Sequence, residues 1–195
     1  ATWRAVPDTT ANNFATMNPL IGTPTNGNVS ILVNGNLTKS QVNASRTSST
    51  ISTPKTGKWY AEFHASGSGS IFPYTGVALA NSEPATIGGQ SNAFQVANTN
   101  TYTGVNYHLF NSTTTQAETN PPGLGDILGV ALDVDNGIVY YYKNGTLLRT
   151  DNTLIKSENY VFLVQTTNDG AGGTTWYTSN ANFGQNPTFS GNTTA

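Results

Sequence analysis

The chain has 195 residues, of which only 9% are charged, and its formal net charge is −2. A soluble domain usually carries about 25% charged residues; here 31 Thr and 24 Asn supply much of the polarity instead. The few Lys and Arg form no cationic stripe for nucleic acid, and no apolar run approaches the roughly 20 residues that membrane insertion needs. Without Cys there is no disulfide, thiolate metal site or cysteine nucleophile.

Short runs of β-branched and aromatic residues, separated by Gly, Pro and Asn, recur along the chain and predict an all-β sandwich. No window has the apolar spacing of an amphipathic helix. In chain order, strands are expected at residues 29–33, 58–65, 75–80, 127–134, 138–143, 146–150 and 160–166. Loops are expected at residues 66–70, 81–92, 111–125 and 167–175.

Residues 127–150 make the most specific local prediction. Asn-Gly at 136–137 and at 144–145 suits two-residue type I′ turns, because both central positions of such a turn need a positive φ. This register places Asp133 opposite Tyr140, and Tyr140 opposite Arg149. One face is then apolar and is expected to face the core: Leu132, Tyr141 and Leu148, with Val130, Val134 and Val139 nearby.

Three motifs follow one another in order along residues 57–187. Residues 57–63 read GKWYAEF, residues 125–137 read GDILGVALDVDNG with YYYKNG soon after, and residues 182–187 read NFGQNP. They resemble the opening strand, the central signature and the closing strand of the SPRY domain family, except that Asn186 stands where Arg is common. The resemblance implies a concanavalin-like sandwich of two bent antiparallel sheets, without catalytic activity, that binds proteins through loops at one edge.

The start of the chain carries a second resemblance. Residues 12–20, NNFATMNPL, are similar to the lead-in of SPRY-containing structural proteins of bacteriophages, whose tail fibres and capsid appendages share this Thr- and Asn-rich composition. We therefore expect a protein on the surface of a phage virion. The chain is expected to be one domain over 1–195, with edge strands and loops at 1–56, the SPRY core at 57–189 and a tail at 190–195. Whether it forms a homotrimer stays open.

Aromatic residues in loop-like segments are the candidate anchors for a partner. Tyr and Trp combine a large apolar face with a polar tip, and neighbouring Asn side chains supply neutral hydrogen bonds. The expected binding loops are residues 72–74, 83–92, 98–103 and 111–122. The candidate binding residues are Tyr74, Tyr102, Phe72, Asn92, Asn100 and Trp176.

Two kinds of partner are expected, a neighbouring virion protein or a host-surface protein or glycan. Two alternatives remain open, a lectin-like carbohydrate-binding module and a peptide-binding adaptor inside a cell. Saccharide binding would distinguish the first alternative, and binding of short linear peptides would distinguish the second.

Carboxylates near the first Asn-Gly turn invite a calcium interpretation. An EF-hand loop starting at Asp133 would need Gly at position 138 and Glu at position 144. These positions hold Ile138 and Asn144, so an EF-hand loop is excluded. We expect Asp133 to pair with Tyr140 and Arg149 instead. No metal and no cofactor are expected.

The enzyme hypothesis depends on the few residues that could act as acids, bases or ligands. Glu62 and Asp133 are the acidic residues most clearly placed on strands, and a glycosidase needs such a pair. However, Glu62 matches a Glu of the SPRY opening strand, which implies a structural role. His64 and His108 have no companion ligands for a metal. We expect no enzymatic activity.

Overall fold

The computed structural model describes residues 14–20, 31–40, 45–67, 72–81, 93–98, 107–110, 114–117, 120–166 and 177–184. All regular elements in these ranges are strands, and no helix there is long and apolar enough to cross a membrane. The strands are β1 (Ile31–Val33), β2 (Thr38–Ser40), β3 (Ser45–Ser48), β4 (Lys58–Gly67), β5 (Phe72–Leu79), β6 (Ala93–Asn98), β7 (Tyr107–Phe110), β8 (Thr114–Ala117), β9 (Ile127–Asp133), β10 (Ile138–Lys143), β11 (Thr146–Asp151), β12 (Tyr160–Thr166) and β13 (Tyr177–Asn182).

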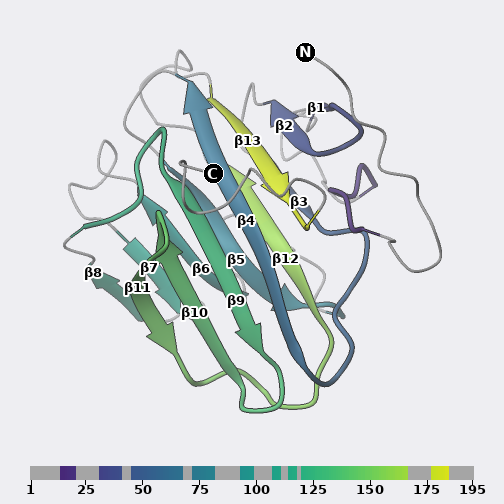
Figure 1. Ribbon diagram of the computed structural model, residues 1–195, viewed down its shortest axis with the longest axis vertical. Coiled ribbons are helices and arrows are strands. Elements are labelled where there is room, and N and C mark those ends of the chain that lie inside the picture. Colours follow the sequence, from purple (N-terminus) through teal and green to yellow (C-terminus); the bar gives the residue numbers. More distant parts are fainter. Residues whose placement is uncertain are drawn as a thin grey trace.

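Two antiparallel sheets form the layers of a sandwich (Figure 1). The seven-stranded sheet has the order β1-β2-β13-β4-β9-β10-β11, and the six-stranded sheet has the order β3-β12-β5-β6-β7-β8. Several neighbours in each sheet are far apart in sequence, as where β13 pairs with β4. The predicted all-β sandwich of two antiparallel sheets is confirmed.

The core lies between the sheets and draws side chains from both. Phe63 of β4 and Tyr141 of β10 are almost fully buried on one side, and Val77 of β5 and Phe162 of β12 are buried on the other. The ring of Phe63 lies 6.5 Å from that of Phe162 and meets Phe183 edge-on at 6.0 Å. Burial of each such side chain contributes roughly 1.5–3 kcal/mol, so these contacts hold the layers together.

The lead-in segment at 14–20 joins the two sheets at one side. The Met17 N–H donates to the carbonyl of Asn36, in the turn between β1 and β2, at 2.8 Å. The Asn18 N–H donates to the carbonyl of Ser48, on β3 of the other sheet, at 2.7 Å. The Met17 side chain is 1% exposed and belongs to the core. The segment is therefore part of the sandwich.

The register predicted for the first hairpin was wrong. Asp133 pairs with Ile138 across a four-residue connection, so Tyr140 lies opposite Ala131. The Asp133 carboxylate accepts hydrogen bonds from the backbone N–H of Asn136 at 3.1 Å and from its side-chain amide at 3.0 Å. These bonds stabilise a wider turn than the Asn-Gly pair alone would select.

The second turn has the predicted length, but a β-bulge follows it. Lys143 pairs with Thr146 across a two-residue turn, and the register then shifts between Tyr141 and Tyr142. As a result Arg149 lies opposite Tyr141, and not opposite Tyr140 as predicted. A bulge depends on how the strand packs, and no sequence signal marks it here.

The predicted core face is nevertheless correct. A register shift of two residues returns each side chain to the same face of a strand. Five of the six predicted core residues are fully buried, and Leu148 packs half-buried against them. The five are Val130, Leu132, Val134, Val139 and Tyr141.

Several strands differ in their bounds from the strands predicted from the sequence. The strands predicted at 138–143 and 160–166 have those bounds, whereas β5 begins at Phe72 and β8 lies inside the predicted loop at 111–125. β2, β3 and β13 were not predicted, because they are rich in Thr, Ser and Asn and lack the apolar residues by which strands are recognised. β6 and β7 were also missed. The predicted loop at 167–175 lies outside the described residues.

Two Asn-Gly glycines provide a matched test of the turns. Gly137 has φ +68° and Gly35 has φ +65°, but a Cβ on Gly137 would lie 2.6 Å from the carbonyl oxygen of Leu154, whereas one on Gly35 meets nothing within 4 Å. We expect Gly35→Ala to cost about 1–2 kcal/mol for the left-handed backbone, and Gly137→Ala about 2 kcal/mol more. Chemical denaturation of both variants measures the difference, and equal losses would contradict the turn geometry.

Candidate functional site

The two hairpin turns mark opposite ends of the sandwich, here named the Asn136 end and the Asn144 end. Strand termini of both sheets gather at the Asn144 end, which lies toward the upper left of Figure 1. β4 and β6 end there, and β5, β9 and β13 begin there. The predicted binding loops at 83–92 and 98–103 lie outside the described residues, apart from Asn98 at the end of β6.

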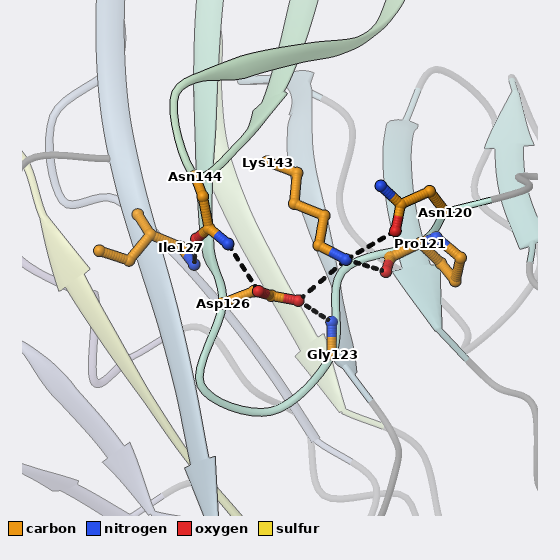
Figure 2. A network of polar contacts seen from close by, with 7 residues as sticks. All are labelled: Asn120, Pro121, Gly123, Asp126, Ile127, Lys143 and Asn144. Carbon is orange, nitrogen blue, oxygen red and sulfur yellow. Dashed lines mark hydrogen bonds and ion pairs between the residues drawn. The ribbon is translucent and has the colours of Figure 1, made fainter. Parts of the chain in front are cut away.

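A partly buried carboxylate organises the described part of the Asn144 end (Figure 2). The Oδ2 atom of Asp126 accepts hydrogen bonds from the backbone N–H of Gly123 at 2.7 Å and from the Lys143 ammonium at 3.2 Å. Its Oδ1 atom accepts from the side-chain amide of Asn144 at 2.7 Å. One side chain therefore joins the segment before β9 to the turn between β10 and β11.

Lys143 and Asn144 extend this network on both sides. The Lys143 ammonium also donates to Asn120 Oδ1 and to the carbonyl of Pro121, each at 2.9 Å. The Asn144 side-chain oxygen accepts from the Ile127 N–H at 2.8 Å, and the Asn144 N–H donates to the Ile127 carbonyl at 2.9 Å. We name this set of contacts among residues 120–127, 143 and 144 the Asp126 clamp.

The clamp changes the acidity of its carboxylate. Burial raises the pKa of Asp126, but the hydrogen bonds from Gly123, Asn144 and Lys143 together lower it by more, so the pKa lies below its usual value. Asp126 therefore stays ionised at neutral pH and pairs with Lys143 without leaving net charge. The Gly-Asp and Lys-Asn-Gly steps that resemble the SPRY signature are thus direct partners in space.

The candidate binding residues are only partly within the described structure. Tyr74 is half-buried within β5, and Phe72 is the first residue of that strand, so the predicted loop at 72–74 is wrong. The β-bulge between Phe72 and Thr75 shows that this stretch pairs irregularly with β6. Their role as anchors stays a prediction. The other four candidates lie outside the described residues: Tyr102, Asn92, Asn100 and Trp176.

The contacts predicted for Asp133 were wrong. Its carboxylate forms an ion pair with Lys58 at 3.1 Å and accepts hydrogen bonds from Asn136, whereas Tyr140 and Arg149 lie elsewhere in the register. These two partners lower the pKa of Asp133, with the Asn136 side chain as the largest cause, against the opposing effect of burial. Asp133 therefore closes the first hairpin.

The two carboxylates of the glycosidase hypothesis are far apart. Glu62 is buried, and it accepts hydrogen bonds from the Tyr60 hydroxyl at 2.9 Å and the Asn182 amide at 3.2 Å. Asp133 pairs with Lys58, four residues along β4 from Glu62, which corresponds to about 13 Å. Glycosidase pairs lie roughly 5–10 Å apart. Glu62 instead bridges β4 and β13.

The histidines and acids form no metal cluster within the described ranges, where no three His, Cys, Asp or Glu side chains gather. His64 is half-buried on β4; burial lowers its pKa, and nearby Asp126 opposes this shift. The side chain of His108 lies outside the described structure.

A shallow groove on the outer face of the seven-stranded sheet, near the Asn136 end, was not predicted from the sequence. Its aromatic lining comes from Tyr60 of β4 and from Tyr140 of β10, with Ala131 of β9 between them. The correct strand register would have predicted the groove, because it places Tyr60, Ala131 and Tyr140 in one row. The predicted hairpin register placed Tyr140 opposite Asp133, so this row was not recognised.

Comparisons with known proteins identify the fold. No protein-family model matches the sequence, and no curated protein matches it. Among solved structures, the chain is similar to the SPRY domain of human HERC1, with a TM-score of 0.61 and 12% identity over 87% of this chain and 99% of that one. The TRIM65 PSpry domain gives a TM-score of 0.62 and 16% identity, over 86% and 89%.

Stonustoxin is also similar, with a TM-score of 0.57 and 17% identity, over 87% of this chain. The chain spans only 27% of the stonustoxin chain. The chain has the fold of SPRY domains. At these identities the likeness concerns fold alone, so the site has to be argued from its own residues.

The Asp126 clamp predicts an acid-sensitive stability. Because the folded pKa of Asp126 lies below that of the unfolded chain, its ionised form stabilises the fold above about pH 4, and this contribution is lost as the pH falls through the folded pKa. We expect Asp126→Asn to cost about 2 kcal/mol at neutral pH, since an amide offers one acceptor oxygen in place of two. The difference should shrink in denaturation measurements as the pH falls below the ordinary carboxyl pKa and through the lower folded pKa.

A surface acid provides the control for this experiment. Glu158 pairs with Lys55 at 3.2 Å, with side chains 39% and 58% exposed. Glu158→Gln should cost less than about 0.5 kcal/mol. A pH-independent loss in Asp126→Asn, or an equal loss in Glu158→Gln, would contradict the role of the clamp.

Proposed function

We propose that the chain is a non-catalytic binding module that holds a protein partner at the Asn144 end. The observation that carries this proposal is the Asp126 clamp, which joins three stretches of chain at the end where strand termini of both sheets gather. Binding surfaces typically consist of loops positioned by a rigid scaffold. The clamp supplies such a scaffold at the Asn144 end.

The resemblance to SPRY domains supports a protein as the partner. That resemblance implies binding through loops at one edge of the sandwich, and the fold likeness to HERC1 and TRIM65 agrees with it. Beside the clamp, Leu147 is 53% exposed on β11, one pair away from the Asn144 turn. An exposed Leu next to a rigid turn is a suitable apolar contact for a protein surface.

We further propose that the module belongs to the surface of a phage-type particle. The Thr- and Asn-rich composition and the lead-in at 12–20 support this placement, and the described part of that lead-in is built into the sandwich through Met17. The partner would be a protein of the host surface or a neighbouring protein of the particle. Tyr102, Asn100 and Trp176 remain the candidate anchors for it.

Two exposed apolar residues at opposite ends allow a matched binding test. We expect Leu147→Arg to weaken binding of the labelled chain to intact bacteria by about tenfold or more, because a charge is placed in the contact. Ile155→Arg, at the Asn136 end and 51% exposed, should leave binding unchanged. Protease treatment of the cells should abolish binding.

Equal losses in both variants would contradict the Asn144 end as the binding surface. Binding that survives protease treatment would contradict a protein partner. Absence of saturable binding on a broad panel of bacterial strains would contradict the host-surface partner and leave a neighbouring particle protein.

The low charge of the chain predicts a weak salt dependence of this binding. Asp126 and Lys143 neutralise each other at the Asn144 end, so little long-range field steers a partner. Between about 50 and 500 mM salt, the screening length falls from roughly 14 to 4 Å. The affinity should change less than about threefold over this range; a larger loss in titrations at the two salt concentrations would contradict the expectation.

A further inference from the structure

The groove on the outer face of the seven-stranded sheet lies at the opposite end from the proposed protein-binding surface. It has a volume of about 190 Å³ and opens over β4, β9 and β10. Tyr60 is 50% exposed there, which leaves much of an aromatic side chain in contact with water. Exposed aromatic surface of this kind is typical of a binding site.

The groove has a small floor beside two tyrosines. Strand register aligns Tyr60, Ala131 and Tyr140 in one row across three strands. Neighbouring strands lie about 4.8 Å apart, so the backbones that carry the two tyrosines lie about 10 Å apart, on either side of Ala131. The Tyr60 ring leans away from this row over Gly129, so the floor at Ala131 beside Tyr140 has room for one ring.

One wall is fixed in place before any ligand arrives. The Tyr60 hydroxyl donates to the buried carboxylate of Glu62 at 2.9 Å. Its ring leans over Gly129, where a Cβ would collide with the Tyr60 hydroxyl, and this direction leaves the floor at Ala131 open. A preorganised wall reduces the entropy that binding would otherwise cost.

The polar side of the groove is electrically neutral. Lys58 and Asp133 form an ion pair at 3.1 Å, with Lys58 77% exposed and Asp133 5% exposed. The Lys58 ammonium has three donor hydrogens, more than this pair uses. The Tyr60 hydroxyl donates to Glu62 and can still accept a hydrogen bond. A neutral ligand with hydroxyl groups matches this set better than an anion or a cation.

We propose that this groove binds one neutral pyranose ring of a glycan. Stacking on Tyr140 above the Ala131 floor accounts for the ring, and the donor and acceptor at the edge of the groove account for the hydroxyl groups. The volume equals that of about six water molecules, which suits a single ring rather than a peptide of several residues. The site does not depend on the proposed protein-binding function, since it uses none of the residues of the Asp126 clamp.

The test uses the full chain and neutral tetrasaccharides: cellotetraose, maltotetraose and chitotetraose. With ¹³C-labelled alanine methyl groups, NMR titration should show a saturable shift of the Ala131 methyl with at least one of them. Tyr140→Ala should weaken this binding by about tenfold or more. Ala131→Leu, which fills the floor, should abolish the binding while the remaining alanine signals keep their positions and report an intact fold.

Two control variants distinguish binding in this groove from binding elsewhere on the chain. Ile31→Ala removes an exposed apolar side chain of β1, at the far edge of the same sheet, and should bind as the wild type does. Leu147→Arg should also retain saccharide binding, which keeps failure of this site distinct from failure of the protein-binding proposal. The proposal is overturned if no tetrasaccharide shifts the Ala131 methyl, or if Ile31→Ala loses as much affinity as Tyr140→Ala.

Discussion

The hydrogen bonds around the Asp126 carboxylate are the constraint on which the described part of the sheet most depends. β9 lies between β4 and β10 in the seven-stranded sheet, and its first residue is held by Asn144. Asp126 orients that Asn144 amide and neutralises Lys143. A shift at this point would therefore move β9 against both of its neighbours. The core contacts of Leu128 and Val130 follow from this placement, as does the open floor at Ala131 on the other face.

Alternation along each strand is the part of the fold that sequence predicts well. The buried face of β9 and β10 was correct although the register was wrong, because a four-residue turn in place of a two-residue one shifts the pairing by two positions. The turn itself was decided by Asp133, whose carboxylate holds Asn136. Strands such as β2 and β13 carry Thr, Ser and Asn, and they become strands because neighbouring strands offer them partners. Such long-range pairing has no local signal.

The candidate functional sites show the same difference between what local sequence predicts and what depends on long-range pairing. The family resemblance selected the Gly-Asp and Lys-Asn-Gly steps, and these do meet in the Asp126 clamp. Sequence alone pointed to aromatic residues in loops, yet Phe72 and Tyr74 belong to β5. The groove was missed because it is made by small residues as much as by aromatic ones. Ala131 and Gly129 contribute to the groove because these small residues leave space beside Tyr60 and Tyr140. That space can be recognised only when the register of β4, β9 and β10 is known.

The two proposed surfaces lie on the same rigid strands. β10 carries residues of both surfaces, and Tyr140 of the groove lies three residues from Lys143 of the clamp, about 10 Å along the strand. Neither surface alone implies a tight contact, since the groove holds a single ring and the Asn144 end carries little net charge. Two modest contacts at a fixed separation reinforce each other, because once one is made the other forms at a high effective concentration. A glycosylated surface protein offers both kinds of ligand at such a spacing, and the sheet that carries both sites needs no rearrangement to engage them together.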